Sequence, residues 1–296
     1  MIKRCFSLSL AILLLLASLG GCASSGSAAQ VAATTLPVYQ FTAALCQGTP
    51  ITVTRLVAQS VSCLHDYSLN VSQVRAVEAA QVVVISGGGL EEFMQELLST
   101  AEVVIDSSEG ISLLESGHHH HEEAHDHHHH HEADAHIWLS PVNAKQMASN
   151  ICQGLSLQYP AQADIFRKNL ESLHARLDRL YEYGRQRLSD LSCRELITFH
   201  DGFGYLAQAF DLQILEAIEE ESGSEASAQE LKHLVELVRE HQLPAVFTER
   251  SSNASAAQII CAEAGIGSYT LDMAMAGEDY FEAMYHNIDT IKEALG

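Results

Sequence analysis

The sequence predicts an α/β protein of two lobes, each with a mainly parallel sheet, joined by one long rigid helix. Short β-branched runs alternate with helical segments, a pattern typical of parallel sheets with crossover helices. The runs fall into two batches, before about residue 145 and after about residue 192, and a strongly periodic segment separates them. The chain has 296 residues and is 47% apolar. This is enough for two lobes of roughly 130 residues each.

The first 21 residues predict an export signal. Lys3 and Arg4 precede an apolar run over residues 8–17, which is too short to span a bilayer as a stable helix. The Leu-Gly-Gly-Cys sequence that ends at Cys22 resembles a bacterial lipobox, so we expect a lipoprotein signal peptide over residues 1–21 and lipid on Cys22. An ordinary signal peptide followed by a chance cysteine is the alternative. The Ser-, Gly- and Ala-rich stretch that follows predicts a tether over residues 22–34.

Two lobes follow the tether. The first is expected over residues 35–160, with strands at residues 51–57, 82–86 and 103–106 and a His-rich loop over residues 116–133. The second is expected over residues 192–296, with strands at residues 196–199, 245–248 and 268–271.

A connecting helix is predicted between the lobes, over residues 161–191. Its apolar residues recur at alternating steps of three and four, the period of one helix face. They are Phe166, Leu170, Leu173, Leu177, Leu180, Gly184, Leu188 and Leu191. A helix of about 25 to 30 residues is longer than most globular helices. We interpret it as a rigid connector that limits hinge opening; a surface helix of a single domain is the alternative.

Charge excludes one class of partner. The chain carries 16 Lys and Arg against 38 Asp and Glu, a formal charge of −22. Loss of Lys3 and Arg4 with the signal would leave 14 basic residues against 38 acidic ones, a charge of −24. Nucleic acids need basic protein surface, so no nucleic-acid partner is expected, whereas cations would be attracted.

Ten of the 17 His fall within residues 118–131, which indicates metal ions. Residues 121–125 match the H-E-x-x-H pattern of metalloproteases, but their flanks offer no apolar stripe to dock a helix, so a protease is not predicted. We expect a flexible, exposed collector that binds several ions weakly. Its histidines are His118, His119, His120, His121, His125, His127, His128, His129, His130 and His131.

The Gly-rich segment over residues 86–91, Ser-Gly-Gly-Gly-Leu-Glu, follows a predicted strand. It lacks the Lys and Ser or Thr of a phosphate-binding loop. Glu91 and Glu92 would repel phosphate and favour a helix N-terminus, so we predict a plain tight turn.

Export permits disulfides, and five cysteines follow Cys22, so at least one stays unpaired. Because each pair flanks a predicted helix and strand, the expected bonds join Cys46 to Cys63 and Cys152 to Cys193. The sequence does not fix the connectivity.

Three further histidines lie in ordered contexts. His65 lies in Cys-Leu-His-Asp-Tyr after a predicted strand, His136 in Asp-Ala-His-Ile-Trp-Leu-Ser-Pro, and His200 at the end of a strand in Phe-His-Asp-Gly-Phe-Gly-Tyr. A lone histidine in such a loop is usually a hydrogen-bonded core residue. Ligands, however, bind at strand ends of α/β lobes. Two such histidines in one lobe and one in the other favour a metal site.

In this order, the three motifs resemble those of the zinc and manganese solute-binding lipoproteins of ABC transporters, over about residues 35–294. The resemblance implies a metal cleft between the lobes, with His65, His136 and His200 as ligands. Asp272 matches a position where members offer a carboxylate, so it is expected as the fourth ligand. An indirect role for Asp272, or a water in the fourth position, is the alternative.

Neighbouring acidic residues are less defined. Asp66 and Asp201 would orient the imidazoles or cap the following helices. Glu249 falls at an acidic position of the family and has no assigned role. Residues 221–227 lack the prolines common in the family.

Zinc is the expected metal, with Mn²⁺ as the alternative. Imidazoles favour Zn²⁺ over Mn²⁺, which prefers more oxygen ligands. Three histidines and one aspartate suit tetrahedral Zn²⁺. In manganese-binding relatives the position of His200 is often Glu, and a His-rich tract is typical of zinc members. Affinity alone does not exclude Ni²⁺ or Cu²⁺.

The resemblance implies a monomeric receptor, anchored by lipid to the outer face of the bacterial cytoplasmic membrane. It would capture Zn²⁺ and deliver it to an ABC permease driven by its ATPase subunit. Such a protein is not an enzyme. The alternatives are a manganese receptor of the same type, a zinc hydrolase, for which no general base can be named, and a surface protein for metal storage or cell adhesion.

Overall fold

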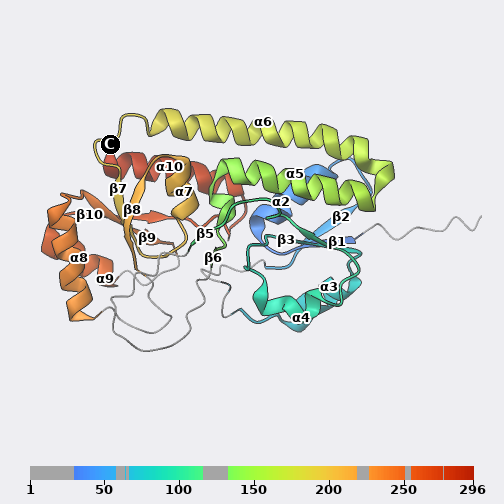
Figure 1. Cartoon of the computed structure of the whole chain (residues 1–296), viewed down its shortest axis with the longest axis horizontal. Helices are drawn as coiled ribbons and strands as arrows, with labels where there is room; N and C mark the ends of the chain where they lie inside the picture. Colours follow the sequence, from blue (N-terminus) through green and yellow to red (C-terminus); the bar gives the residue numbers. More distant parts are fainter. Residues whose placement is uncertain are drawn as a thin grey trace, which may run out of the picture.

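The computed structural model describes residues 30–57, 64, 67–115, 133–218, 227–250, 255–275 and 277–296. Figure 1 shows two lobes below one long helix. Each lobe is built on a four-stranded sheet. The strand orders are β2-β1-β3-β4 and β10-β9-β7-β8, and all neighbours within these two sheets are parallel. The predicted α/β fold class is confirmed.

The first sheet contains β1 (Gln30–Ala33), β2 (Thr52–Arg55), β3 (Val82–Ile85) and β4 (Val104–Asp106). The strand β1 lies inside this sheet, paired with β2 on one side and β3 on the other, and its Val31, Ala32 and Ala33 are buried. The predicted end of the tether at residue 34 is therefore wrong, because the last four residues before Thr34 form a strand. Their sequence, Gln-Val-Ala-Ala, resembles the small-residue stretch before it; only pairing on both edges reveals the strand.

Helices cover the first sheet, and two of them begin at a side-chain cap. They are α2 (Leu36–Cys46), α3 (Val71–Ala79), η2 (Glu92–Met94), α4 (Gln95–Leu98), η3 (Ile137–Leu139) and α5 (Pro141–Gln158). Asn70 and Gln73 form a reciprocal capping box at α3, and the Ser140 hydroxyl accepts the Asn143 N–H at the start of α5. A short antiparallel ladder of β5 (Leu114–Glu115) and β6 (Ala133–Asp134) joins the two ends of the His-rich tract.

The predicted connecting helix is α6 (Ala163–Arg187), with 25 residues, preceded by the turn η4 (Pro160–Gln162). It packs on α2 and α5 of the first lobe and on α10 (Tyr280–Leu295) of the second. Phe166, Leu173, Leu177, Leu180 and Gly184 form its buried face, as the period predicts. No helix of the described residues is long and apolar enough to cross a membrane.

The second sheet contains β7 (Glu195–Thr198), β8 (Gln213–Ala217), β9 (Ala245–Glu249) and β10 (Gly267–Leu271), flanked by α7 (Gly204–Ala209), α8 (Ala228–Glu240), α9 (Ser255–Ala264) and α10. Three of its strands were predicted. The fourth, β8, was not predicted; it is an edge strand that is only partly buried and whose register shifts beside Leu196.

One apolar core extends through both lobes. It includes Phe41 and Trp138 of the first lobe, and Phe247 and Tyr280 of the second, all fully or nearly fully buried. The Tyr280 ring stacks edge-on against Phe41, with centroids 5.1 Å apart, and its hydroxyl donates to the Trp138 carbonyl at 2.7 Å. The lobes are therefore joined by packed side chains as well as by α6.

The predicted disulfide between Cys152 and Cys193 is absent, because both are free cysteines; among the described residues Cys46 is free as well. Cys152 lies on α5 of the first lobe, whereas Cys193 lies beyond the far end of α6, which spans roughly 37 Å at 1.5 Å per residue. A disulfide needs Cα atoms within about 7 Å. Cys63, the predicted partner of Cys46, lies outside the described residues.

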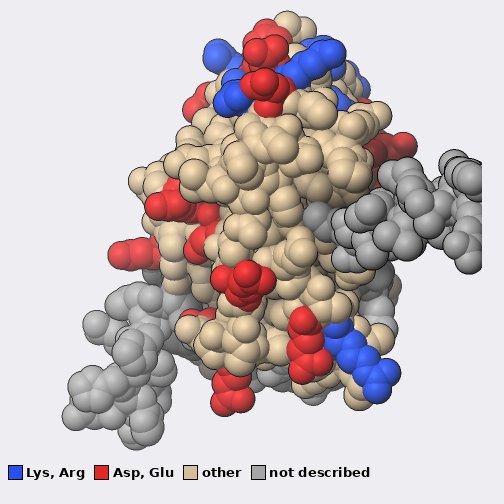
Figure 2. All heavy atoms as spheres, turned by 90° about the vertical axis from the view of Figure 1, so that its right-hand side faces the viewer, with Lys and Arg blue, Asp and Glu red and all other residues tan. Residues whose placement is uncertain are grey.

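Basic side chains concentrate on α6, which carries six of the 16 Lys and Arg: Arg167, Lys168, Arg176, Arg179, Arg185 and Arg187. Figure 2 shows basic and acidic groups together at the upper end of one face, while much of the remaining charge there is acidic. This face offers no continuous basic surface.

Candidate metal centre

His136 lies between β6 and η3, and its side chain is buried. Asp134 fixes it twice, since one carboxylate oxygen, Oδ1, lies 2.8 Å from the His136 backbone nitrogen and 2.8 Å from ring atom Nδ1. A carboxylate acceptor at Nδ1 favours a proton on that nitrogen and leaves Nε2 with a free lone pair. The sequence analysis did not name Asp134 as the partner of His136, although the two are only two residues apart.

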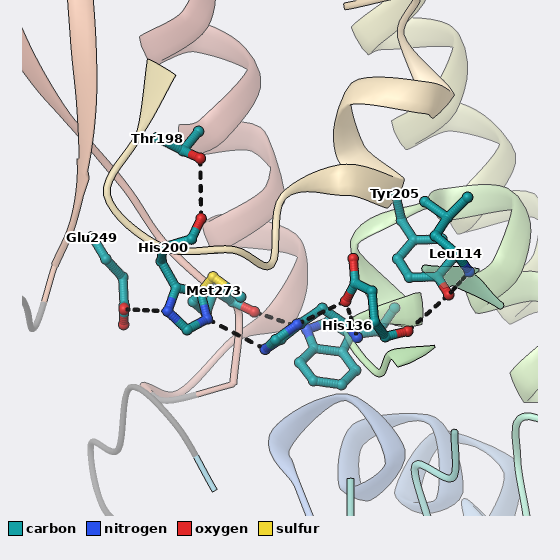
Figure 3. A network of polar contacts seen from close by, with 9 residues as sticks. Leu114, His136, Thr198, His200, Tyr205, Glu249 and Met273 are labelled. Carbon is teal, nitrogen blue, oxygen red and sulfur yellow. Dashed lines mark hydrogen bonds and ion pairs between the residues drawn. The ribbon is translucent and has the colours of Figure 1, made fainter. Parts of the chain in front are cut away.

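His200 approaches His136 from the second lobe. It follows β7 after one residue, and the Thr198 hydroxyl donates to its carbonyl at 3.0 Å. The two Nε2 atoms are 3.5 Å apart, and the ring planes lie 84° from parallel (Figure 3). The other ring nitrogen of His200, Nδ1, lies 3.8 Å from Glu249 Oε2, which is longer than a hydrogen bond but close for opposite charges.

This spacing fits a shared cation. Two nitrogens bound to tetrahedral Zn²⁺ at about 2.0 to 2.1 Å lie about 3.3 to 3.4 Å from each other. The observed Nε2 to Nε2 distance of 3.5 Å is close to this value, and the free lone pair of His136 lies on Nε2, the nitrogen that faces His200.

Gly202 makes room for the two rings. A Cβ atom at this position would lie 2.8 Å from His136 Nδ1, 2.8 Å from His200 Cδ2 and 2.7 Å from Met273 Cε. Any larger residue would push at least one imidazole away, because such short carbon contacts do not occur without movement.

Glu249 is buried at the end of β9. Burial raises the pKa of this carboxyl from 4.5 to about 7; the charge of Asp272 raises it further, and His136 opposes the rise. A carboxylate at the end of a buried strand, facing a predicted ligand, is the signal that could have assigned Glu249 a role.

Asp272 directly follows β10 and is buried near Glu249, whose pKa it raises. Its Oδ1 accepts the Ala274 N–H at 2.8 Å, and its Oδ2 lies 3.3 Å from Arg250 Nε. The Asn287 side chain binds both the backbone N–H and the carbonyl of Asp272, each at 2.7 Å. The backbone and Oδ1 of Asp272 are held by hydrogen bonds, whereas Oδ2 contacts only the exposed Arg250 among the bonds described.

Several predicted site residues lie outside the part of the chain that the structure describes. These are His65, Asp66, Cys22, Cys63 and the His-rich tract. Within the described ranges, no group of three or more His, Cys, Asp and Glu side chains is arranged to hold a metal ion. The described part of the site is therefore a facing pair of imidazoles with carboxylates behind them.

The Gly-rich turn is a separate polar cluster. Glu91 Oε1 accepts the Thr34 hydroxyl at 2.6 Å and the Ser86 N–H at 2.8 Å, and Oε2 accepts the Gly87 N–H at 3.0 Å. The amides that would cradle a phosphate in a nucleotide-binding loop are thus filled by the chain's own carboxylate, which supports the predicted tight turn.

Two parallel-sheet lobes bridged by a long helix, with imidazoles from both lobes facing each other at strand ends, define a class: two-lobe solute-binding proteins for metal ions. The family model described as "Zinc-uptake complex component A periplasmic", ZnuA, matches residues 31–294. The chain belongs to this family, whose members serve transport. It is not an enzyme, so the hydrolase alternative is wrong.

Individual relatives agree with this assignment. The "High-affinity zinc uptake system protein ZnuA" of Bacillus subtilis is 28% identical over 96% of this chain and 95% of its own length. "Zinc-binding lipoprotein AdcA" of Streptococcus pneumoniae TIGR4 is 30% identical over 89% of this chain, which spans only 55% of AdcA. A crystal structure of ZnuA superposes with a TM-score of 0.77 at 30% identity, covering 91% of this chain and all of the other.

Proposed function

We propose that this protein captures Zn²⁺ between its lobes through the imidazoles of His65, His136 and His200, and delivers the ion to an ABC permease driven by its ATPase. The observation that carries the proposal is the Nε2 to Nε2 distance of 3.5 Å between His136 and His200, which come from different lobes. The third imidazole, His65, would follow β2 on the first lobe, at the same end of the sheets.

Asp272 is proposed as the fourth ligand and Glu249 as the group that orients His200. Asp272 Oδ2 would exchange Arg250 for the cation, while Oδ1 keeps its bond to the Ala274 N–H. Glu249 faces Nδ1 of His200, the nitrogen turned away from His136, just as Asp134 faces Nδ1 of His136. Metal-binding histidines commonly give their second N–H to such a partner.

Zinc fits this donor set better than manganese does, because imidazole nitrogens outnumber oxygens. The names of the B. subtilis and S. pneumoniae relatives, both zinc proteins, support the same choice. We further propose that Cys22 carries the lipid that anchors a monomeric protein to the outer face of the cytoplasmic membrane, and that residues 118–131 collect ions weakly.

Metal analysis tests the site. Protein lacking residues 118–131 is expected to retain one tightly bound Zn²⁺ per molecule, and H65A, H136A and H200A to weaken zinc affinity by more than about 100-fold, since even the partners of ligands contribute 10- to 100-fold. H174A and H286A are matched controls, because these histidines bond to Lys145 and Thr270 carbonyls on other elements. An unchanged dissociation constant would remove a histidine from the site.

The carboxylate roles separate in the same assay. D272A is expected to lose a ligand and weaken zinc more than E249Q does; the reverse order would make Glu249 the ligand. If deletion of residues 118–131 abolished all tight zinc binding, a metal-storage protein would be favoured instead. Tighter binding of Mn²⁺ than of Zn²⁺ would favour a manganese receptor.

A further inference from the structure

Arg55 joins the two lobes through backbone carbonyls. It ends β2 of the first lobe, where its Nε donates to the Val57 carbonyl at 2.7 Å. Its Nη1 and Nη2 cross to the second lobe and donate to the carbonyls of Gly277 at 2.8 Å and Met275 at 2.9 Å. Burial lowers the pKa of this guanidinium. Its planar fork suits three fixed acceptors, which a lysine cannot reproduce.

Arg55 donates to a stretch of the second lobe, residues 273–275 and 277–278, that contains two left-handed backbone positions. Ala274 and Gly277 have φ values of 53° and 88°, in the left-handed region. Its carbonyls accept from two more first-lobe side chains: Trp138 Nε1 donates to Met273 at 2.8 Å, and Gln40 Nε2 donates to Glu278 at 2.6 Å. The segment belongs to the second lobe by sequence, yet four of its carbonyls accept hydrogen bonds from side chains of the first lobe.

Asp272 lies where the hydrogen-bond partners of the backbone change from the second lobe to the first. Its backbone is bound by Asn287 of α10, in the second lobe, whereas the carbonyl of the next residue is bound by Trp138 of the first. At the other end of the Arg55 contact, Val57 begins the connection that leads to His65. The Val57 N–H is in turn held by the Thr34 carbonyl at 2.9 Å. One guanidinium therefore binds both the end of β2 and the backbone three and five residues after Asp272.

We propose that Arg55 is a positioning residue of the metal site, fixing the backbone that follows Asp272 against the end of β2 and thereby slowing zinc release. This inference rests on the proposed function. Because Arg55 bonds only carbonyls among these contacts, it holds the backbone in place without competing with the metal for a carboxylate.

The test is zinc dissociation into excess chelator, measured for wild type, R55K, Q40A, D272A and the double variant R55K/D272A. R55K is expected to release zinc at least tenfold faster, the scale of one lost hydrogen bond from a charged group. Q40A is the matched control. It also removes a first-lobe donor, but its acceptor, the Glu278 carbonyl, lies farther along the chain from Asp272. In the D272A background, R55K is expected to add nothing.

Equal acceleration by R55K and Q40A, or an R55K effect that persists fully without Asp272, would overturn the inference and leave the zinc site standing. Absence of tight zinc in the wild type would overturn the proposed function and this inference with it. Thermal unfolding of each zinc-free variant identifies one that fails to fold; R55Q, which removes the charged fork and shortens the stem, then takes the place of R55K with the same expectation.

Discussion

His136 and His200 turn their Nε2 atoms toward each other at 3.5 Å, although 64 positions separate them in the sequence and each belongs to a different lobe. The approach depends on a carboxylate behind each ring and on a glycine beside both. Each of these supports can be removed singly, and the consequences differ.

Asp134→Asn is expected to weaken zinc affinity about 10- to 100-fold while the fold persists. The amide retains an acceptor for the His136 backbone N–H but loses the negative charge at Nδ1. Competition with a chromogenic chelator measures the change. Asp178→Asn, at an exposed ion pair with Lys145, serves as the control. Equal affinities for D134N and wild type would show that Asp134 does not tune the site.

Gly202→Ala is expected to reduce zinc affinity at least tenfold, which corresponds to about 1.4 kcal/mol, because the added methyl group collides with both imidazoles. Gly267→Ala provides a comparison, since its Cβ would meet only the Tyr269 ring, at 2.9 Å. Calorimetric titration of both variants checks the prediction. If G202A and G267A bind alike, the rings adjust freely and the tight fit around Gly202 is unimportant.

The zinc-free protein is expected to lose stability as the pH rises from about 4.5 to about 7, because burial raises the pKa of Glu91 from 4.5 to about 7. The folded state then binds a proton that the unfolded state has released, so the free energy of unfolding falls with pH across this window, by roughly 3 kcal/mol from this group. Urea unfolding at pH 5, 6 and 7 measures the slope.

Glu91→Gln removes that titration and should reduce the slope; the slope that remains comes from Glu249, whose pKa burial also raises to about 7. Glu92→Gln, at the exposed neighbour, should leave the slope unchanged. E91Q should also be less stable at pH 5, since an amide offers only one oxygen to three donors. Parallel pH profiles for E91Q and wild type would contradict the assignment.

Free thiols are expected in the exported protein. Under denaturing conditions without reductant, Cys46, Cys152, Cys193 and Cys261 should all react with an alkylating reagent, as mass spectrometry would show. In the folded state Cys46 should be protected, because it is buried and burial raises the pKa of its thiol to about 12. A mass that lacks two alkyl groups would indicate a disulfide.

Periodicity and motif spacing predicted the features that depend on local sequence. The stripe from Phe166 to Gly184 predicted the buried face of α6, and the runs around Val82 and Ala245 predicted the strands β3 and β9. Strand pairing between residues far apart in the sequence could not be predicted from these local patterns. The strand β1 has only one β-branched residue and is defined by neighbours 22 and 51 positions away, at Val53 and Val82.

The candidate site divides in the same way. His136 and His200 could be predicted because each lies in a recognisable sequence motif, and the structure brings the two side chains together. Asp134 and Glu249 were not assigned, since what matters is the direction in which each carboxylate points. The proposed disulfide from Cys152 to Cys193 failed because distance along α6, rather than sequence separation, decides whether two thiols meet.

The central place of β1 also has a mechanical consequence. Because it pairs along both edges with parallel neighbours, tension applied at its N-terminal end acts along the strand and loads both ladders in shear. All the hydrogen bonds along both edges must then yield together, instead of opening one after another as at a peeled edge strand. A protein anchored to a surface through its N-terminal end therefore resists unfolding when force is applied at that end.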